Sequence, residues 1–402
     1  MIMATTARND TVMHAYLDLR AISEIPGDAL SSSTSLMSAC GGNTGNLLFR
    51  HALKSLLDLS GFEAMNYADL SGALAEGKVY ESILISAANW IGASELRELQ
   101  CKTRADLILK AGLPVVILGL GAQAPLHESD LKLGPETLRF MSVLSSHCKF
   151  ISVRDEFTAR LFERHGFHNV ITTGCPSNFI NSRDLLEEVI AQRAEQLKPL
   201  RLVDVAVSHC EIATGHPMSQ TVLAKTLREL REIGDSQYIG QSSALVQFFC
   251  NEEESLPKIY SAAAAEAGFS EGELGAMLRK KLRYFSSVPE WLGSVGQRQL
   301  VAGMRIHGAM AGIQAGVPSL LIGHDSRTQG LAQVMGIPMI SPEEYVALRG
   351  GFLKRDVLPR LAELIQRQIT GYAAKRSLLR KAFDTVLFSG NGYRPPAPQT
   401  DS

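Results

Sequence analysis

Short runs of β-branched and apolar residues alternate with helical patterns along most of this chain. The runs that predict strands are 82–85, 114–118, 150–153, 203–207, 245–249 and 319–322. Between them, segments such as 47–59 and 156–164 repeat apolar residues at three- and four-residue spacing, as amphipathic helices do. Alternation of this kind builds parallel sheets covered by helices. The predicted fold class is therefore α/β.

The chain has 402 residues, more than one hydrophobic core usually supports. A charged helical pattern at 183–196 ends at Lys198 and Pro199, and a new strand pattern follows within a few residues. We therefore predict an N-terminal α/β domain at 1–198 and a C-terminal one at 199–386, whose last helices are placed to pack back on the first domain. The residues after 386 include a stretch rich in proline, serine and glutamine, which predicts a flexible tail at 387–402.

Charge and cysteine content exclude several classes of protein. The formal net charge of -1 provides no overall field for nucleic acid, so no nucleic-acid partner is expected. Six cysteines without a C-x-x-C pair argue against a disulfide scaffold and a thiolate zinc site. His165 and His168 have no acidic or thiol ligand beside them, so no metal is expected. Without an apolar leader or a long apolar run, we expect a cytoplasmic protein with no transmembrane segment.

The most informative local motif is the run 301–308, which leads into a short apolar helical pattern that ends at Gly316 and Pro318. Arg305 and His307 lie where that helix should begin. Helix starts carry unpaired N–H groups and partial positive charge, so this motif predicts an anion site. A lone histidine near an apolar helix is more often a core residue, but the neighbouring arginine favours a binding role.

A second arginine, Arg154, follows the strand pattern at 150–153, and Asp155 is placed to cap the next helix. Ligands of open α/β sheets bind outside the carboxyl ends of the strands, although a salt bridge would also explain this arginine. Two arginines facing one cleft suggest a ligand with two anionic groups. Asp325 and Arg327 hold a similar edge position, and a loop ion pair explains them nearly as well.

Two glycine-rich segments and one tryptophan are ambiguous. The run 39–46 predicts a turn between a strand and a helix, which either approaches a ligand or only reverses the chain. The run 119–124 fits G-x-G-x-x-A, but Pro125 follows where a dinucleotide-binding helix should begin, so a loop lining the cleft is the better interpretation. Trp291 could stack on a sugar ring or pack in the core.

With these motifs in hand, the chain resembles the polysaccharide pyruvyl transferase family over most of residues 36–345. The segments that carry the resemblance are 42–46, 114–121, 150–157, 173–176 and 305–308 together with 316–318. Each motif is modest, and their order and spacing together are specific.

The resemblance implies two Rossmann-like domains with parallel sheets, similar to the GT-B glycosyltransferases, with a cleft between them. It also implies transfer of the enolpyruvyl group of phosphoenolpyruvate onto two hydroxyls of a sugar, in an exopolysaccharide or its precursor. A cyclic pyruvate ketal forms, phosphate leaves, and no cofactor takes part. The expected catalytic residues are His307 and Arg305. The expected substrate-binding residues are Arg154, Arg305, His307, Ile306, Gly308, Asn43, Asn46 and Gly121.

One departure concerns the acceptor base, because many family members carry Gly-Asp where this chain has Gly45 and Asn46. An asparagine cannot deprotonate a hydroxyl, so Asn43 and Asn46 would position the acceptor at most. Our initial hypothesis is that the two arginines hold the donor while His307, as imidazolium, protonates the enol methylene or the departing phosphate.

Two other functions and several properties stay open at this stage. A GT-B glycosyltransferase would use Arg305 and the helix start to bind the diphosphate of a nucleotide-sugar. A sugar-binding protein without activity is the third reading. The acceptor could be a lipid-linked oligosaccharide, a nucleotide-sugar or a finished polymer, and a lipid-linked acceptor would bring the protein to the inner membrane surface. Oligomerisation is also left open.

Overall fold

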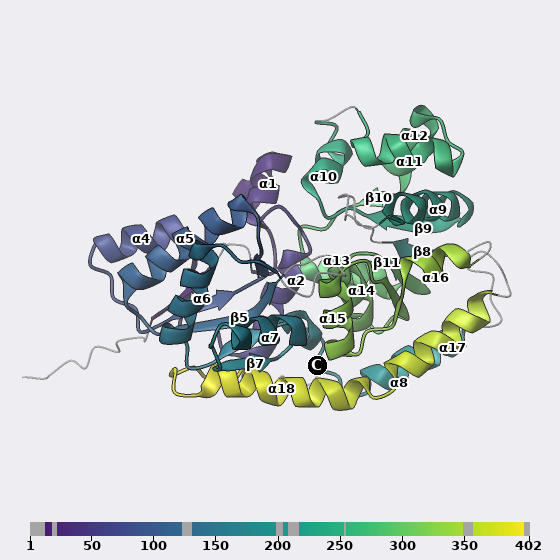
Figure 1. Ribbon diagram of the computed structural model, residues 1–402. Helices are drawn as coiled ribbons and strands as arrows, with labels where there is room; N and C mark the ends of the chain where they lie inside the picture. Colours follow the sequence, from purple (N-terminus) through teal and green to yellow (C-terminus); the bar gives the residue numbers. More distant parts are fainter. Residues whose placement is uncertain are drawn as a thin grey trace, which may run out of the picture.

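Two parallel sheets lie beside each other, each flanked by helices, and the C-terminal helices α17 (Val357–Ile369) and α18 (Tyr372–Phe388) run beneath them (Figure 1). The computed structural model describes residues 13–17, 22–122, 131–197, 204–207, 217–252, 255–348 and 357–397. Within them the first sheet has the order β2-β1-β3-β5-β6-β7, and β4 pairs with β5. Its strands are β1 (His14–Leu17), β2 (Phe62–Met65), β3 (Ile83–Ser86), β4 (Asn89–Ile91), β5 (Val115–Ala122), β6 (Ile151–Val153) and β7 (Val170–Thr172).

The second sheet has the order β10-β9-β8-β11-β12-β13 among the described residues. Its strands are β8 (Asp204–Val207), β9 (Asp235–Ile239), β10 (Leu282–Arg283), β11 (Leu300–Gly303), β12 (Ser319–Ile322) and β13 (Met339–Ile340). All pairings between these strands are parallel. In both sheets the strand order reverses partway across, and the carboxyl side of such a reversal is where open α/β sheets bind ligands. The predicted α/β class with parallel sheets is confirmed.

Helices cover both sheets. Those of the first half are η1 (Gly27–Ser31), α1 (Ser33–Ala39), α2 (Asn46–His51), α3 (Leu53–Leu56), α4 (Tyr67–Ala75), α5 (Glu95–Ala111), α6 (Pro135–His147), α7 (Glu156–Arg164), η2 (Pro176–Phe179) and α8 (Leu186–Glu195). The later ones are α9 (Ser219–Glu232), α10 (Ser243–Phe249), α11 (Lys258–Ala267), α12 (Glu271–Lys281), α13 (Val288–Gly296), α14 (Ile306–Gln314), α15 (Ser326–Met335), α16 (Pro342–Ala347), α17 (Val357–Ile369) and α18 (Tyr372–Phe388).

Three local predictions were wrong. The run 245–249 is helix α10, because Leu245 and Phe248, three residues apart, both turn into the core; a short apolar run cannot by itself separate helix from strand. The glycine turn after Ala39 follows helix α1 and not a strand. Gly119 and Gly121 belong to strand β5, where a register shift and the positive φ of Gly119 mark a bulge, so they do not form a loop.

One large cluster of buried side chains extends across both halves of the chain. It joins Tyr16 and Phe49 of the first half to Leu320 of the second and Phe383 of α18. Trp291 belongs to a neighbouring cluster, where its ring stacks on Phe285 with centroids 5.7 Å apart and only 1% of its surface is exposed. Trp291 is therefore a core residue, and the packing interpretation holds.

Helix α18 fastens the C-terminal segment to the first half. Arg380 Nη1 donates to the carbonyl of Ser55 at 2.9 Å, and the Asp58 amide donates to the carbonyl of Arg394. The hydroxyl of Tyr393 lies 2.9 Å from Ser82 Oγ, and its ring packs edge-on against His14. The tail predicted at 387–402 is thus wrong up to Arg394, since a buried aromatic ring anchors it. The boundary predicted at 198/199 and the last residues, 398–402, lie outside the described residues.

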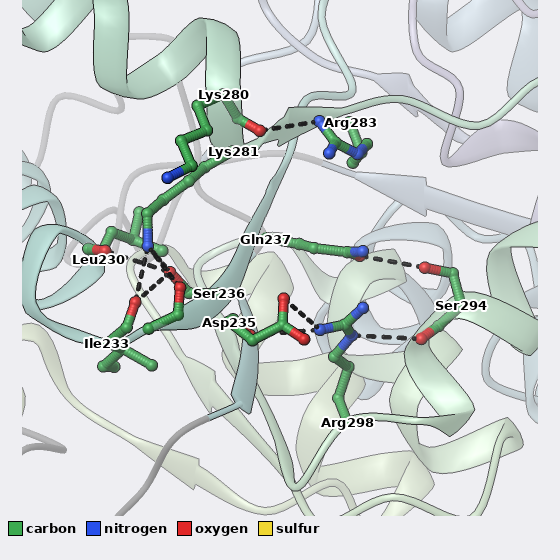
Figure 2. Close-up of polar contacts among 11 residues, drawn as sticks. Leu230, Ile233, Asp235, Ser236, Gln237, Lys280, Lys281, Arg283, Ser294 and Arg298 are labelled. Carbon is green, nitrogen blue, oxygen red and sulfur yellow. Dashed lines mark hydrogen bonds and ion pairs between the residues drawn. The ribbon is translucent and has the colours of Figure 1, made fainter.

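A polar network surrounds the amino-terminal end of strand β9 in the second sheet (Figure 2). Lys281 Nζ donates to the carbonyl of Ile233 and to Ser236 Oγ, at 2.6 Å each. Arg298 pairs with Asp235 at 3.4 Å. These contacts tie the start of β9 to the helices around it.

The close packing of helix α14 on the second sheet yields a stability prediction. A Cβ at Gly312 of α14 would overlap Ser319 Oγ and lie 2.8 Å from Val301 Cβ. Gly312→Ala should therefore lower the free energy of unfolding by about 1–3 kcal/mol, measured by urea denaturation. Gly293→Ala in α13 is the control, because nothing lies within 4 Å of its added methyl. That control should be neutral or stabilise by about 0.5–1 kcal/mol, and equal behaviour of the two variants would contradict the packing argument.

Candidate active site

A pocket of about 60 Å³ lies where the carboxyl ends of the two sheets meet. That volume is several times the roughly 10–15 Å³ that one water molecule requires. The first half contributes Asn43, Asn46, Ala88, Asn89 and Arg154, and the second contributes Gln241, Met304, Arg305, Ile306, His307, Arg327, Thr328 and Leu331. No aspartate or glutamate is among these lining residues. The pocket is therefore polar and positively charged.

Arg154 lies directly after β6 and is only 2% exposed. Its Nη2 donates to the carbonyl of Ala87 at 3.0 Å, its guanidinium lies 5.3 Å from the ring centre of Phe49, and its buried Nε has no hydrogen-bond partner. A carbonyl, and not a carboxylate, accepts its hydrogen bond, so the salt-bridge explanation does not apply. Gly121 makes room for it: an added Cβ would lie 2.5 Å from Asn89 Oδ1 and 3.3 Å from Arg154 Cδ.

Arg305 and His307 lie at the start of α14, as the sequence predicted. Arg305 is the N-cap, and Ile306, His307 and Gly308 form the first turn. The imidazole of His307 is 6% exposed, tilts against Phe49 with centroids 5.6 Å apart, and places Nε2 3.8 Å from Cys175 Sγ. Ser177 Oγ lies 3.2 Å from the same sulfur. Residues of the first half thus hold a ring that belongs to the second half.

Burial lowers the pKa of His307 well below its usual value, and the guanidinium groups of Arg154, Arg327 and Arg305 lower this pKa further. Near neutral pH the ligand-free imidazole is therefore uncharged. In the ligand-free protein three cations surround the ring, and no carboxylate is among the lining residues that the structure describes. A bound anion would have to supply that negative charge.

Arg327 is the third guanidinium of the pocket, which the sequence analysis did not assign to the site. It pairs with Asp325 at 3.2 Å, as one of the two interpretations had it, yet it also lines the pocket. Asp325 caps α15 through a hydrogen bond from the Thr328 amide at 2.7 Å. Asp155 caps α7 in the same way beside Arg154. The usable signal was this pattern of an arginine and a capping aspartate just past a strand end.

The glycine turn joins the two halves at the pocket. The Thr44 amide donates to the carbonyl of Gln241 at 3.1 Å, and a Cβ at Gly45 would overlap Gln241 Oε1. Asn43 Oδ1 accepts from the Gly45 amide, and Asn46 Nδ2 donates to the carbonyl of Cys40, at 2.9 Å each. A carboxylate could not donate this last bond. An asparagine at position 46 therefore suits the local turn.

The structure brings most of the predicted site residues together. Arg154, Arg305, Ile306, His307, Asn43 and Asn46 line one pocket. Gly121 lies behind its wall, and Gly308 is buried in α14 without lining it. Gln241, Asn89 and Arg327 were missed. Gln241 follows β9 and Asn89 opens β4, positions that only the strand order reveals as neighbours.

Two further searches concern metals and membranes. Among the residues that the structure describes, no three histidine, cysteine, aspartate or glutamate side chains gather in a way that could hold a metal ion. Within the same residues, none of the helices combines the length and apolar character needed to cross a bilayer.

Comparison with known proteins adds a family to this geometry. Residues 43–326, well over half of the chain, match the polysaccharide pyruvyl transferase family. The chain belongs to this family. It is therefore an enzyme of the pyruvyl transferase class, and all the described lining residues of the pocket except Arg327, Thr328 and Leu331 fall inside the matched segment. No curated protein sequence matches the chain at a significant level.

Several solved structures of enzymes that handle UDP-sugars resemble the chain distantly. The Anabaena protein HepE, in complex with UDP and glucose, is 12% identical with a TM-score of 0.42, over 93% of this chain and 96% of that one. S. aureus MnaA with UDP is 10% identical with a TM-score of 0.43, over 97% and 98%. A putative UDP-N-acetylglucosamine 2-epimerase from Listeria monocytogenes is 12% identical with a TM-score of 0.43, over 97% and 100%.

The charge state of His307 can be tested without any ligand. In the protein labelled at its histidines, the NMR signals of this ring, assigned by their loss in His307→Gln, should stay those of a neutral imidazole well below pH 6.5. Arg305→Gln and Arg327→Gln should each raise its pKa, because each removes a neighbouring positive charge. Arg160→Gln, an exposed change on α7, is the matched control and should not shift it. A ring that titrates at its ordinary value in the unmodified protein would contradict the account.

Proposed function

We propose that this enzyme transfers the enolpyruvyl group of phosphoenolpyruvate to two hydroxyls of one sugar in a polysaccharide or its precursor, forming a cyclic pyruvate ketal and releasing phosphate. The observation that carries the proposal is the set of three arginines around a histidine of lowered pKa, in a pocket whose described lining residues include no carboxylate. Family membership supports the same reaction class. Phosphoenolpyruvate has both a carboxylate and a phosphate, which suits several guanidinium groups in one small space.

Donor binding would use the arginines and the helix start together. The Nε atoms of Arg154 and Arg327 are buried without hydrogen-bond partners, so a bound oxyanion would satisfy them. Arg305 precedes the first turn of α14, whose free N–H groups and dipole favour negative charge. The donor's negative charges would then offset the three cations, and the cost of charging His307 would fall.

The proposed reaction needs no net proton from outside the two substrates, because one hydroxyl proton replaces the proton given to C3 and the other leaves with phosphate. With the donor bound, His307 takes up a proton and delivers it to C3 of the enol, which makes C2 electrophilic. One sugar hydroxyl attacks C2 and returns its proton to His307. The bond between C2 and the phosphate oxygen then breaks, the second hydroxyl closes the ring on C2, and its proton leaves with phosphate. One histidine thus serves as acid and base in turn.

Asn46 has a positioning role in this scheme. Its amide nitrogen donates to the carbonyl of Cys40, and no carboxylate is among the lining residues that the structure describes. Among these residues His307 is suited to act as acceptor base, because a neutral imidazole can accept a proton. Asn43, Asn89 and Gln241 provide neutral amides that suit sugar hydroxyls.

Calorimetric titration distinguishes this function from the glycosyltransferase alternative. Phosphoenolpyruvate should bind saturably, and Arg305→Gln and Arg327→Gln should each weaken binding about tenfold or more, because each removes a charge-assisted hydrogen bond. Arg160→Gln should bind like the unmodified protein. Uridine diphosphate should not compete for the pocket. Binding of that nucleotide, with none of phosphoenolpyruvate, would favour a nucleotide-sugar glycosyltransferase instead.

Proton uptake tests how the donor and His307 are coupled. The pKa of His307 is lowered in the free protein and should rise in the donor complex, so the complex holds more protons in the pH window between the two values. Donor affinity should therefore rise as pH falls through that window. Titrations in buffers of different ionisation enthalpy count the protons, and His307→Asn should lose this component. Equal proton counts in both proteins would contradict the coupling.

A further inference from the structure

A second group of arginines lies beside the donor pocket, in the first and middle turns of α5. Arg97 and Arg104 are two turns apart and therefore share one side of this helix. Both side chains are partly buried. Helix α5 follows β4, whose first residue, Asn89, lines the donor pocket. The pair is thus attached to the wall of the site while neither residue lines the pocket itself.

Among the described residues, these arginines have no acidic partner. Arg97 Nη1 donates to Gln100 Oε1 at 3.0 Å. The guanidinium of Arg104 lies over the Trp90 ring, 3.9 Å from its centre, and Nε donates to the Tyr67 hydroxyl at 3.3 Å. Its Nη1 is buried and has no hydrogen-bond partner. The available contacts are therefore neutral or aromatic, and one buried donor is unsatisfied.

The carboxylates nearest in sequence are engaged elsewhere or exposed. Glu98 accepts hydrogen bonds from the amides of Glu136 and Thr137 and so caps α6. Asp106 pairs with Arg139. Glu95 is exposed to solvent. None of them offsets the two cations.

The electrostatics place this pair next to the donor arginines. Burial lowers the pKa of Arg97, and the positive charges of Arg104 and Arg327 lower this pKa further. Arg327 belongs to the second half of the chain and lines the donor pocket, so the charge of Arg97 lies within electrostatic range of a residue of that pocket. A cation pair held partly out of water without a counter-charge is unfavourable, and a bound anion would relieve it.

We propose that Arg97 and Arg104 form an anion subsite for a phosphate or diphosphate group on the acceptor, beside the donor pocket. The identification of the bound molecule as the acceptor rests on the proposed function, whereas the anion site itself does not depend on that function. The donor's own charges are matched by the three arginines inside the pocket, so this pair is left for the other substrate. The acceptor is then a phosphate-bearing precursor, either lipid-linked or nucleotide-linked, and not a finished neutral polymer.

The test is a titration of the full-length protein, already saturated with phosphoenolpyruvate, with inorganic pyrophosphate. Pyrophosphate should bind as a second anion, and Arg97→Gln and Arg104→Gln should each weaken it about tenfold. Lys102→Gln removes one charge from an exposed position of the same helix and should have no effect. Arg97→Gln leaves the stack of Arg104 on Trp90 in place, so it should fold normally, as its melting temperature will show.

Unchanged pyrophosphate binding in Arg97→Gln and Arg104→Gln, or no binding at all, would overturn the subsite. Farnesyl diphosphate and uridine diphosphate, titrated in the same way, distinguish the two sources of the phosphate. Tighter binding of farnesyl diphosphate, weakened by Arg97→Gln, would indicate a lipid-linked acceptor. Tighter binding of uridine diphosphate, weakened by the same change, would indicate a nucleotide-linked one. Arg97→Gln should weaken phosphoenolpyruvate binding much less than it weakens pyrophosphate binding. If phosphoenolpyruvate itself fails to bind, the proposed function fails, and pyrophosphate titration of Arg305→Gln with and without Arg97→Gln still tests the subsite.

Discussion

Three guanidinium groups crowd around one imidazole of lowered pKa, and the rest of the site depends on this concentration of positive charge. Arg154, Arg305 and Arg327 all lower the pKa of His307, and no carboxylate is among the lining residues that the structure describes. Asp155 and Asp325 cap helices α7 and α15, and Asp325 also pairs with Arg327. The ligand-free site is therefore prepared for an anion, and anion binding can change the charge of His307.

The fold supplies the rigidity that such a site requires. Arg154 and Arg327 each follow a strand end, and Arg305 precedes a helix that is packed so closely on β11 and β12 that Gly312 has no room for a methyl group. Gln314, at the far end of that helix, donates to the Tyr372 hydroxyl of α18, which in turn donates to Asn178 of the first half. These contacts hold cations from the two halves of the chain in place despite their mutual repulsion.

Much of this could be read from the sequence, and the failures have physical causes. Parallel α/β architecture, Arg154 and the Arg305–His307 motif follow from periodicity and from strand ends. Arg327 was missed because the sequence explains it equally well as the partner of Asp325 in a loop ion pair. The sequence does not reveal that an arginine in such a pair also lines a pocket. The charge of His307 depends on burial and on three cations from distant segments, which no local pattern contains. Tyr393 is anchored by His14 and Ser82, more than 300 residues away, so a polar-looking tail could not be recognised as packed.

The central claim, that this pocket holds the donor beside His307, is tested most directly by a crystal structure of the protein with phosphoenolpyruvate. The account predicts the carboxylate and phosphate on Arg154, Arg305 and Arg327, with C3 of the donor facing the imidazole of His307. A donor bound away from these arginines, or turned so that its methylene faces away from His307, would contradict it.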